Sequence, residues 1–585
     1  MPMTGLTEQQ RNAVIHDGNL LLTACPGSGK TKTLVAKLAQ RLSLGNLGKK
    51  RLIAITYTNV AADTILERLD NFGIPLSNLW VGTIHSFCLE WIIKPHKGLL
   101  SRISTGYRVV DEYESQEILD NIKANSAVGT FDKIPLKLNY DWSINETGHT
   151  VHAIDVARQY HSHLQREKLI DFDLILNIAL SILLQNPEIG LRLSCLFESC
   201  LIDEYQDTNQ FQYNILREII KHGKSKICLV GDVDQAIYTG LGAVVKNQQE
   251  ICKEFNLSSI DCMTLTGCYR SKQQIIDFYS KFQESPYKID SKQNINFFGE
   301  NLSINQSISK EDLAQHISTI INTYLNHGIP PEEIAVLSPS WYEVTNLGRS
   351  LSTLLPGVRL DSPGLSPIPY SQENVWFKLI RLSHTEVSSK NYYRRYRLAS
   401  EIIQNLIDLD LKIDITTLTA KALLKLSNSI ITPDSDIITY INNIINSYCF
   451  HLKIAYSDSP SATSQYDALL KAVTRRLGKD GVEDCSTCLS KYFNEGSGIK
   501  ITTCHSTKGE EYQVVICTGL LEGKIPHWDD IYRKINNQAP YMARRLLYVI
   551  CSRAKSSLFL ISEKGVYTKG RIEYSQTKQL AQALI

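Results

Sequence analysis

The chain has 585 residues, of which 43% are hydrophobic and 21% charged, and its net charge is +2. This length is too great for one hydrophobic core and indicates about three to five domains. The composition is that of a globular protein, and the balanced charge excludes a global basic field, so any nucleic-acid site must be a local groove. No apolar run has membrane-spanning length and no signal peptide follows Met1, so we expect a cytoplasmic protein without a membrane partner.

The fourteen cysteines are scattered along the chain, and several lie in apolar, strand-like runs. Reduced thiols of a cytoplasmic protein explain this pattern better than disulfides. Cys485 and Cys488 form a lone CxxC pair. A four-cysteine zinc site needs a second pair at ligand spacing, which the sequence lacks, so we do not expect zinc there.

Residues 23–33 read Thr-Ala-Cys-Pro-Gly-Ser-Gly-Lys-Thr-Lys-Thr. The apolar run at 20–24 predicts a buried strand, and leucines at 34, 38 and 42 have helical spacing. Strand, glycine-rich turn and helix in this order are the context that a phosphate-binding loop requires. The alternative is a chance match on a surface turn, which the flanking strand and helix disfavour.

Each residue type in this loop has a chemical reason to be there. Gly27 and Gly29 allow backbone N–H groups to curl around a phosphate at a helix N-terminus. Lys30 would reach the β- and γ-phosphates, and the Thr31 hydroxyl would bind Mg²⁺. Ala24 replaces the first glycine of the common signature. Such a loop alone indicates only nucleoside triphosphate binding.

Polar residues follow several further predicted strands. The apolar run at 51–56 leads into Tyr-Thr-Asn and then a helix, and residues 82–86 read Gly-Thr-Ile-His-Ser. The run at 226–231 ends near Gln235, which is placed to sense a γ-phosphate. Because ligands bind beyond the carboxyl ends of strands in open parallel sheets, we expect these groups on one surface.

Two adjacent carboxylates, Asp203 and Glu204, end the apolar run at 200–202. This is what ATP hydrolysis needs: one carboxylate to hold Mg²⁺ and one to polarise the attacking water. The competing interpretation is an acidic N-cap of a helix. Further along, Tyr269 and Arg270 place an aromatic ring beside a planar guanidinium suited to phosphate.

The alternation of strands and helices is interrupted twice by mostly helical stretches. We therefore predict an α/β protein with two α/β domains, in which helices flank parallel sheets and each domain holds a mostly helical inserted subdomain. The predicted ranges are 1–105 and 186–282 for the first α/β domain, 106–185 for its insertion, 283–385 and 496–585 for the second α/β domain, and 386–495 for its insertion.

In chain order these segments resemble the motifs of the UvrD/Rep-like superfamily 1 DNA helicases, over nearly the whole chain. The similar segments are residues 6–10, 24–31, 56–59, 83–86, 171–174, 203–207, 231–238, 269–270 and 505–511, together with Arg553. A single match is compatible with chance, whereas a full set in family order is not.

The resemblance implies that the two α/β domains are P-loop motor domains of the RecA type, which bind ATP and Mg²⁺. Their closure would step the protein along single-stranded DNA, or DNA with a single-stranded tail, from 3′ to 5′. The implied catalytic residues are Lys30, Glu204, Gln235, Arg270 and Arg553, the last as an arginine finger. The implied nucleotide-binding residues are Gln10, Ala24, Gly27, Ser28, Gly29, Lys30, Thr31, Lys32, Tyr269, Arg270, Glu511 and Arg553, with Gln10 reading adenine. The implied magnesium ligands are Thr31 and Asp203, and the implied DNA-binding residues are Tyr57, Asn59, Thr83, His85, Ser86, Tyr238 and His505.

The sequence departs from the family pattern where DNA binding is coupled to ATP. Gly240 and Leu241 stand where relatives carry a base-stacking aromatic residue and a bridging arginine. Met542 and Ala543 replace two acids of the sixth motif, and Val60 replaces a frequent lysine. These changes leave the predicted ATP chemistry intact and put processive unwinding in doubt.

Two functions from different classes therefore stay open. The first is an ATP-driven translocase and helicase, as in DNA repair. The second is an ATP- and DNA-controlled sensor or regulatory subunit of a nuclease complex with little unwinding of its own, which the departure at Gly240 and Leu241 keeps open. The loop at 23–31 and the compact size of the chain also resemble the helicase subunit of Gabija-type anti-phage defence systems. A fused nuclease is not expected, because only 32 residues follow Arg553.

The departure at Gly240 and Leu241 generates a first prediction. Loss of one stacked base should weaken the grip on single-stranded DNA by about 1–3 kcal/mol, and loss of the bridge should weaken the mutual stimulation of ATP and DNA binding. We expect an ATPase stimulated by single-stranded DNA that unwinds long duplexes poorly, and better unwinding by Gly240→Trp with Leu241→Arg. The measurement is unwinding against duplex length. Efficient unwinding of long duplexes by the unmodified protein would mean that the coupling runs through other residues.

Overall fold

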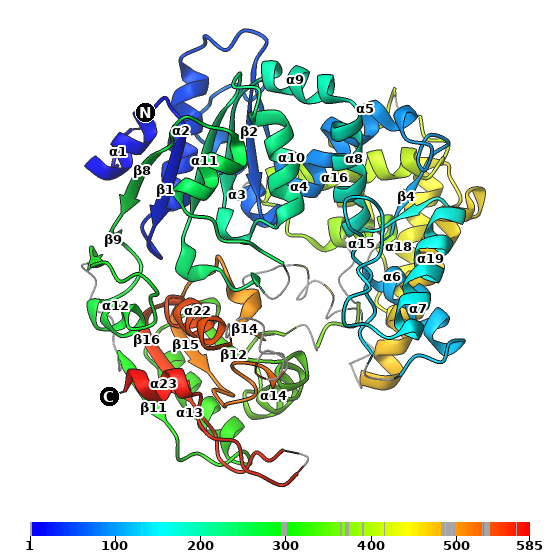
Figure 1. Cartoon of the computed structure of the whole chain (residues 1–585). Coiled ribbons are helices and arrows are strands. Elements are labelled where there is room, and N and C mark those ends of the chain that lie inside the picture. The colour runs from blue at the N-terminus through cyan, green and yellow to red at the C-terminus, as the bar shows by residue number, and fades with distance from the viewer. Residues whose placement is uncertain are drawn as a thin grey trace. The chain divides into compact units, whose positions relative to one another are not determined.

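The computed structural model describes residues 3–110, 112–129, 132–239, 242–293, 301–362, 365–368, 374–388, 391–414, 416–480, 486, 489, 493, 498–528, 531, 539–568 and 570–584. These form two compact units (Figure 1). Unit 1 comprises Met1–Ala24 and Gly29–Leu265, and unit 2 comprises Cys25–Ser28 and Thr266–Ile585. The four domain ranges predicted from the sequence remain a prediction.

Unit 1 is built around a six-stranded sheet in which all paired strands are parallel. In spatial order the strands are β3 (Leu79–Thr83), β2 (Arg51–Thr56), β6 (Phe197–Asp203), β7 (Lys226–Gly231), β1 (Leu20–Ala24) and β8 (Asp261–Leu265). The predicted parallel α/β architecture is therefore confirmed for this half of the chain.

The interior strands β1, β2, β6 and β7 are mostly buried on both faces, which explains why they read as continuous apolar runs. Successive residues of one strand belong to different cores: Ile53 and Ile55 of β2 lie in one cluster, and Leu52 and Ala54 in the other. The second cluster is completed by helices α2 (Lys30–Ser43) and α3 (Asn59–Asp70). No polar group can be placed on either face without losing contact with water.

The first core is larger and is completed mainly by helices. They are α4 (Ile84–Phe87), the π-helix η1 (Cys88–Ile93), α7 (Val151–Arg166), α8 (Phe172–Gln185), α9 (Pro187–Leu196), α10 (Gln210–Ile220) and α11 (Gln248–Phe255). The stretch predicted as the first insertion is mostly helical, with α6 (Glu112–Ala124) and α7, and the short strands β4 (Arg108–Val109) and β5 (Leu169–Ile170) pair within it. Helix α8 packs against α10 and η1 and so belongs to the core of the motor.

Unit 2 contains a second six-stranded parallel sheet. Its order is β11 (Leu302–Asn305), β16 (Ala554–Ile561), β15 (Tyr512–Cys517), β12 (Ile334–Ser338), β14 (Ile499–Thr503) and β13 (Leu360–Asp361). Helices α13 (Leu313–Asn326) and α14 (Trp341–Leu354) share a core with this sheet. Helices α12 (Gln273–Ser280) and α22 (Ala539–Cys551) both contact β16 (Figure 1).

A separate helical core in unit 2 contains most of the predicted second insertion. Its helices are α15 (Val375–His384), α16 (Tyr392–Asp408), α17 (Ala420–Ser429), α18 (Ile437–Leu452) and α19 (Pro460–Asp480). Trp376 is fully buried at its centre and donates a hydrogen bond from Nε1 to the carbonyl of Ala462, at 2.9 Å. Both sheets thus carry a mostly helical insertion, as the sequence predicts.

The described helices include no single one that is long and apolar enough to span a membrane. The consecutive helices α8 and α9 together have the length and apolar composition of a membrane span, but they meet at an angle of 99°. Each described cysteine is a free thiol. Cys485 and Cys488 lie outside the described residues.

Gly190, in a helix of the first core, can be tested against Gly478, a helical glycine of unit 2 that serves as the control. A Cβ atom on Gly190 of α9 would lie 2.3 Å from the carbonyl oxygen of Glu218 in α10, whereas one on Gly478 of α19 would meet nothing within 4 Å. Gly190→Ala should therefore lower the free energy of unfolding of unit 1 by at least about 1 kcal/mol, the lower end of overpacking costs. Gly478→Ala should raise stability by about 0.5–1 kcal/mol, because alanine favours a helix. The measurement is the urea midpoint of each variant, and equal midpoints would show that α9 and α10 are not closely packed.

Candidate functional site

The carboxyl ends of the strands of the first sheet carry most of the residues predicted to be functional. Thr56 of β2 is in register with Thr83 of β3, and Ile55 of β2 with Ile202 of β6. Asp203 of β6 pairs with Val230 of β7. The parallel register therefore brings residues from distant parts of the chain to one edge of the sheet, as expected.

The phosphate-binding loop has the predicted strand–turn–helix form. Ala24 is buried at the end of β1, Gly27 has φ = 70° and Gly29 has φ = 82°, and α2 begins at Lys30. Positive φ values are easily adopted only by glycine, so the two glycines are required for this turn. Ser28 is 2% exposed, and its hydroxyl donates to the carbonyl of Cys25 at 2.7 Å, which stabilises the loop.

The crown of this loop, Cys25–Ser28, belongs to unit 2 and packs against residues 268–270 of the same unit. The backbone N–H of Tyr269 donates to the carbonyl of Gly27 at 2.8 Å. A Cβ atom on Gly27 would lie 2.5 Å from Cβ of Arg270 and 3.0 Å from Sγ of Cys268. Gly27 is therefore fixed both by its backbone conformation and by this close approach.

Lys30 and the predicted carboxylate pair meet at the edge of the sheet. Nζ of Lys30 lies 3.7 Å from Oε1 of Glu204, and both side chains are largely buried. Glu204 has φ = 54°, in the left-handed region that residues other than glycine rarely adopt. Its N–H donates to Oδ1 of Asp203 at 3.0 Å. Strained backbone of this kind concentrates at functional sites, which favours a catalytic interpretation over a simple helix cap.

Asp232, which the sequence analysis did not single out, lies at the centre of a buried polar network beside this pair. Asp232 follows β7 and is fully buried; it accepts hydrogen bonds from Nε2 of Gln235 at 2.8 Å and from the N–H of Asp234 at 3.2 Å. Gln206 donates to Oε2 of Glu204 and accepts from the N–H of Asp232. The position of Asp232 directly after a predicted strand was the signal available in the sequence.

Burial raises the pKa of Asp232, and the nearby charge of Lys30 and the hydrogen bond from Gln235 oppose that shift. A buried carboxyl group beside a lysine is a polarised environment of the kind found at functional sites. Gln235 is 2% exposed. Lys30, Glu204 and Gln235 are thus linked through direct contacts and through Asp232.

Helix α1 (Glu8–Ile15) carries Gln10 against the loop. Gln10 is 3% exposed and forms a capping box with Thr7, whose N–H donates to Oε1 of Gln10 at 3.0 Å. Nε2 of Gln10 lies 2.8 Å from the position that a Cβ atom of Gly29 would occupy. The predicted adenine-reading side chain is therefore in contact with the phosphate-binding loop.

Two lysines of α2 hold the segment that contains α1. Nζ of Lys32 donates to the carbonyl of Gly5 at 2.7 Å, and Nζ of Lys37 donates to the carbonyls of Ala13 and His16 at 3.0 and 2.5 Å. Burial lowers the pKa of Lys37. Lys32, predicted to bind nucleotide, is thus engaged with backbone.

At the other half of the edge, two aromatic rings stack on each other. The ring centroids of Tyr57 and Tyr238 lie 5.0 Å apart with an interplanar angle of 16°. Tyr57 is 44% exposed, and burial together with the charge of Asp207 raises its pKa to about 12. Asn59 begins α3, whose N-cap is Thr58. Two of the predicted DNA-contacting rings are therefore brought together by the fold.

The third group at this edge is the turn after β3. Oγ1 of Thr83 accepts a hydrogen bond from the N–H of Ser86 at 3.3 Å and caps α4. The ring of His85 packs edge-on against Phe172 with centroids 5.4 Å apart. Burial lowers the pKa of His85 to about 4, so the ring is neutral near pH 7. It can accept or donate a hydrogen bond to a phosphate but carries no charge.

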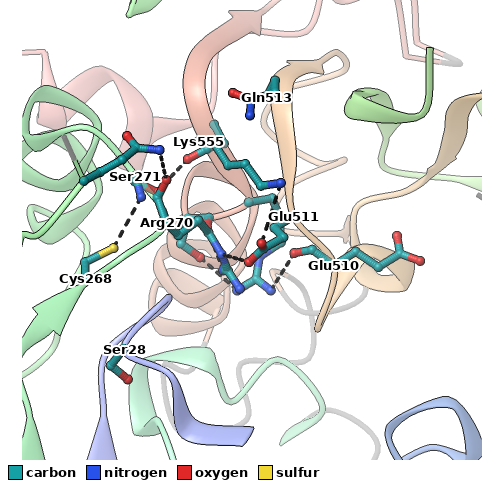
Figure 2. Close-up of polar contacts among 12 residues, drawn as sticks. Ser28, Cys268, Arg270, Ser271, Glu510, Glu511, Gln513 and Lys555 are labelled. Carbon is teal, nitrogen blue, oxygen red and sulfur yellow. Dashed lines mark hydrogen bonds and ion pairs between the residues drawn. The ribbon is translucent and has the colours of Figure 1, made fainter. Parts of the chain in front are cut away.

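In unit 2 the predicted cation Arg270 lies in a chain of ion pairs with Glu511 and Lys555, shown in Figure 2. Nε of Arg270 lies 2.7 Å from Oε2 of Glu511, and Nη1 donates to the carbonyl of Ser552 at 2.9 Å. Lys555 lies 3.6 Å from Glu511 and 3.0 Å from Glu333. Burial raises the pKa of Glu511, but the charges of Arg270 and Lys555 outweigh it and lower the pKa overall.

Arg553 is buried, with 1% of its side chain surface exposed. Its guanidinium donates to the carbonyls of Val549 and Glu510 at 3.1 and 3.2 Å and to the hydroxyl of Ser552 at 3.0 Å. In this conformation the predicted arginine finger is held by neutral oxygens inside unit 2. His505 is exposed and begins a 3₁₀ turn at the end of β14.

Thr31 and Asp203, the two residues predicted to bind magnesium, are each adjacent in sequence to one member of the Lys30–Glu204 contact. Thr31 follows Lys30 in α2, Asp203 precedes Glu204, and the side chains of Lys30 and Glu204 are 3.7 Å apart. A hydroxyl and a carboxylate are hard oxygen donors, and Mg²⁺ commonly takes one or two such ligands with waters and substrate phosphates. The donor set therefore fits this ion. Gly240 and Leu241, where the sequence departs from its relatives, lie outside the described residues.

Comparison with protein families gives two matches on this chain. Residues 6–256 match the UvrD/REP helicase N-terminal domain. Residues 457–565 match the UvrD-like helicase C-terminal domain. The first range contains the edge of the first sheet described above, and the second contains Glu511, Arg553 and Lys555.

Three relatives with similar sequences are also named as DNA helicases. The chain is 28% identical to the ATP-dependent DNA helicase UvrD1 of Mycobacterium leprae over 386 residues, which is 60% of this chain and 48% of that protein. It is 25% identical to the ATP-dependent DNA helicase Rep of Buchnera aphidicola over 98% of this chain and 94% of that protein. A probable DNA helicase II homolog of Mycoplasma capricolum is 24% identical over 96% of this chain. The chain thus spans about half of the UvrD1 sequence that it matches, and nearly all of Rep.

The lowered pKa of His85 leads to a prediction about acid stability. The unfolded chain, in which the pKa of histidine is near 6.5, takes up this proton before the folded chain does. The contribution of His85 to the free energy of unfolding is therefore fully present above about pH 6.5 and falls as the pH drops towards about 4, by up to about 1.4 kcal/mol per pH unit. His85→Gln should lose less stability than the unmodified protein between about pH 7 and pH 5 in urea unfolding, whereas the exposed His152→Gln should behave like the unmodified protein. Identical pH dependence in all three would contradict the burial of a neutral imidazole.

Proposed function

Because the chain carries both the N-terminal and the C-terminal domain of the UvrD/Rep-like helicases, we propose that it is an ATP-driven motor on single-stranded DNA that separates duplex strands. The observation that carries the proposal is the contact between Lys30 and Glu204 beside the buried Asp232, next to a loop built for phosphate. The proposed substrate is DNA with a single-stranded tail, and the proposed direction is 3′ to 5′, as the family resemblance implies.

In this proposal the first unit performs the hydrolytic chemistry. Lys30 neutralises the β- and γ-phosphates, and Glu204 accepts a proton from the attacking water. Thr31 and Asp203 hold Mg²⁺, which neutralises charge on the phosphate oxygens when bound. Gln235, fixed by its hydrogen bond to Asp232, senses the γ-phosphate.

The proposed roles of Arg270 and Arg553 are to neutralise charge that develops on the γ-phosphate. In this structure both side chains already have partners: Arg270 is paired with Glu511, and Arg553 donates hydrogen bonds to carbonyl oxygens. A conformational change is therefore needed before Arg553 acts, which makes hydrolysis responsive to closure of the protein.

The proposed DNA track follows the remaining polar residues of the two sheets. Tyr57 and Tyr238 offer ring faces for bases, and stacking is tolerant of sequence. The predicted phosphate and sugar contacts are Asn59, Thr83, His85, Ser86 and His505. Neutral hydrogen-bonding groups dominate this set, which suits a motor that must release the strand at each step.

A second candidate function is favoured by one observation, the presence of Gly240 and Leu241 at the coupling position. It is an ATP- and DNA-controlled regulatory subunit of a nuclease complex, as in phage defence, with little unwinding of its own. A strand-displacement assay beside an ATPase assay separates the two: DNA-stimulated hydrolysis without displacement favours the regulator.

The central claim is tested by two substitutions with different expected outcomes. Lys30→Ala should abolish hydrolysis, because it removes the cation at the phosphates. Glu204→Gln should still bind ATP and DNA but turn over at least about 100-fold more slowly, the scale of a lost general base. The measurements are ATPase rate and nucleotide affinity, with the exposed Lys97→Ala, outside the site, as the control. Normal turnover by Lys30→Ala, or by both Glu204→Gln and Asp203→Asn, would refute the proposed site.

A further inference from the structure

We propose that Trp341 and Tyr342, at the start of helix α14, form a second base-stacking platform for single-stranded DNA. This surface is assigned to no motif in the sequence analysis, and the inference rests on the proposed function of the chain as a motor on single-stranded DNA. It depends on where the two rings are placed, how exposed they are, and which groups surround them.

The platform stands at the carboxyl edge of the second sheet. Strand β12 is an interior strand that ends at Ser338, and α14 begins three residues later at Trp341. Ser338 is in register with Thr503 of β14, and its carbonyl accepts a hydrogen bond from the N–H of Cys504 at 3.0 Å. This is the edge at which open parallel sheets bind ligands.

The turn that presents the two rings is fixed by packing and capping. Pro339 lies against Gly519, where an added Cβ atom would be 2.7 Å from the proline ring. Oγ of Ser340 accepts from the N–H of Glu343 and caps α14. The beginning of the helix is therefore rigidly placed, and a rigid platform loses little entropy when a base stacks on it.

Both rings face solvent to an unusual degree for large aromatic residues. Trp341 is 54% exposed and Tyr342 is 78% exposed, more than Tyr57 at 44%. The apolar face of α14 is formed instead by Val344, Leu347 and Leu351, which are buried in the core of the second sheet. Trp341 and Tyr342 thus contribute little to folding, although each leaves a large ring in contact with water.

The surroundings suit a polyanion. His505, predicted to bind DNA, and Ser506 are exposed in the turn that follows β14, the strand adjacent to β12. Glu343, the acid that follows the rings in α14, is paired with Lys524 at 2.6 Å, and Lys524 also lies 3.2 Å from Glu563. The carboxylate of Glu343 is therefore turned towards a cation, which reduces its repulsion of a phosphate backbone.

The platform would restore a contact that the sequence lacks elsewhere. Gly240 replaces a base-stacking ring of the relatives, and every base offers a π-face that an exposed tryptophan or tyrosine can cover. Two adjacent exposed rings supply such a face on unit 2. The grip on the strand would then depend on aromatic residues of both units.

The test is the affinity for dye-labelled oligothymidylate, measured by fluorescence anisotropy. Trp341→Ala with Tyr342→Ala should weaken binding roughly 5- to 150-fold, the range for one or more lost stacks. Trp341→Phe with Tyr342→Phe should retain near-normal affinity, because the ring faces remain. Phe450→Ala removes another exposed ring of unit 2, 79% exposed on α18, and should change nothing. Oligothymidylate should also quench tryptophan fluorescence less in Trp341→Phe than in the unmodified protein.

The outcomes separate this inference from the proposed function. If the unmodified protein binds oligothymidylate but the double alanine variant binds equally well, the platform is refuted and the motor proposal stands. If the unmodified protein neither binds oligothymidylate nor hydrolyses ATP faster in its presence, the platform and the motor proposal are both refuted. Reduced self-association of the alanine variant in sedimentation, with unchanged DNA affinity, would assign the two rings to a protein interface and overturn the platform.

Discussion

The burial of both faces of the interior strands in each parallel sheet is the constraint on which the remaining structure depends. Residues of β2 alternate between two apolar cores, so a charged side chain on either face would lose its contact with water. Polar chemistry is left with the carboxyl edge, where strands end and backbone N–H groups of helices begin. The phosphate-binding loop, Asp203, Asp232 and Thr83 are all placed there by strand register. In the second sheet, Ser338 and Thr503 occupy the corresponding edge.

A common electrostatic arrangement recurs in the two units. In unit 1, Lys30 lies beside Glu204 and near the buried Asp232. In unit 2, Arg270 lies against Glu511, which also faces Lys555. Lys30 and Arg270, which we assign to phosphates, thus each already have a carboxylate neighbour, whereas Arg553 is held by carbonyl and hydroxyl oxygens. The charge is oriented before a nucleotide arrives, and an incoming phosphate must compete with a resident anion.

The parts of this picture that the sequence predicts are local ones. The strands β1, β6 and β7 are visible as apolar runs, and the loop at Gly27 and Gly29 follows from spacing and from the flanking elements. The carboxylate pair at Asp203 follows from its place at a strand end. The role of Arg553 as an arginine finger is predicted from the family resemblance alone, because no motif in the surrounding sequence indicates a catalytic residue.

The features that could not be predicted from the sequence are contacts between residues far apart in the chain and the burial or exposure of single side chains. Arg270 and Glu511 are separated by 241 residues, so their pairing depends on how the second sheet closes around them. Two acids, Asp232 and Asp234, follow β7, and only the fold shows that both are buried and that Asp232 accepts the hydrogen bond from Gln235. Likewise, aromatic residues at a helix start read as core, and the exposure of Trp341 is set by which face of α14 meets the sheet.

The attachment of helix α1 has a consequence for how base and phosphate are recognised together. The helix is short and buries few apolar residues, so its position depends largely on the carbonyl groups that Lys32 and Lys37 hold near its two ends. These lysines project from the same helix that begins with Lys30. Gln10 and Lys30, to which we assign the base and the phosphates, are therefore attached to the same helix. In the proposed function, a tilt of α2 on loss of a phosphate would move Gln10 as well, so that both ends of the nucleotide would be released together.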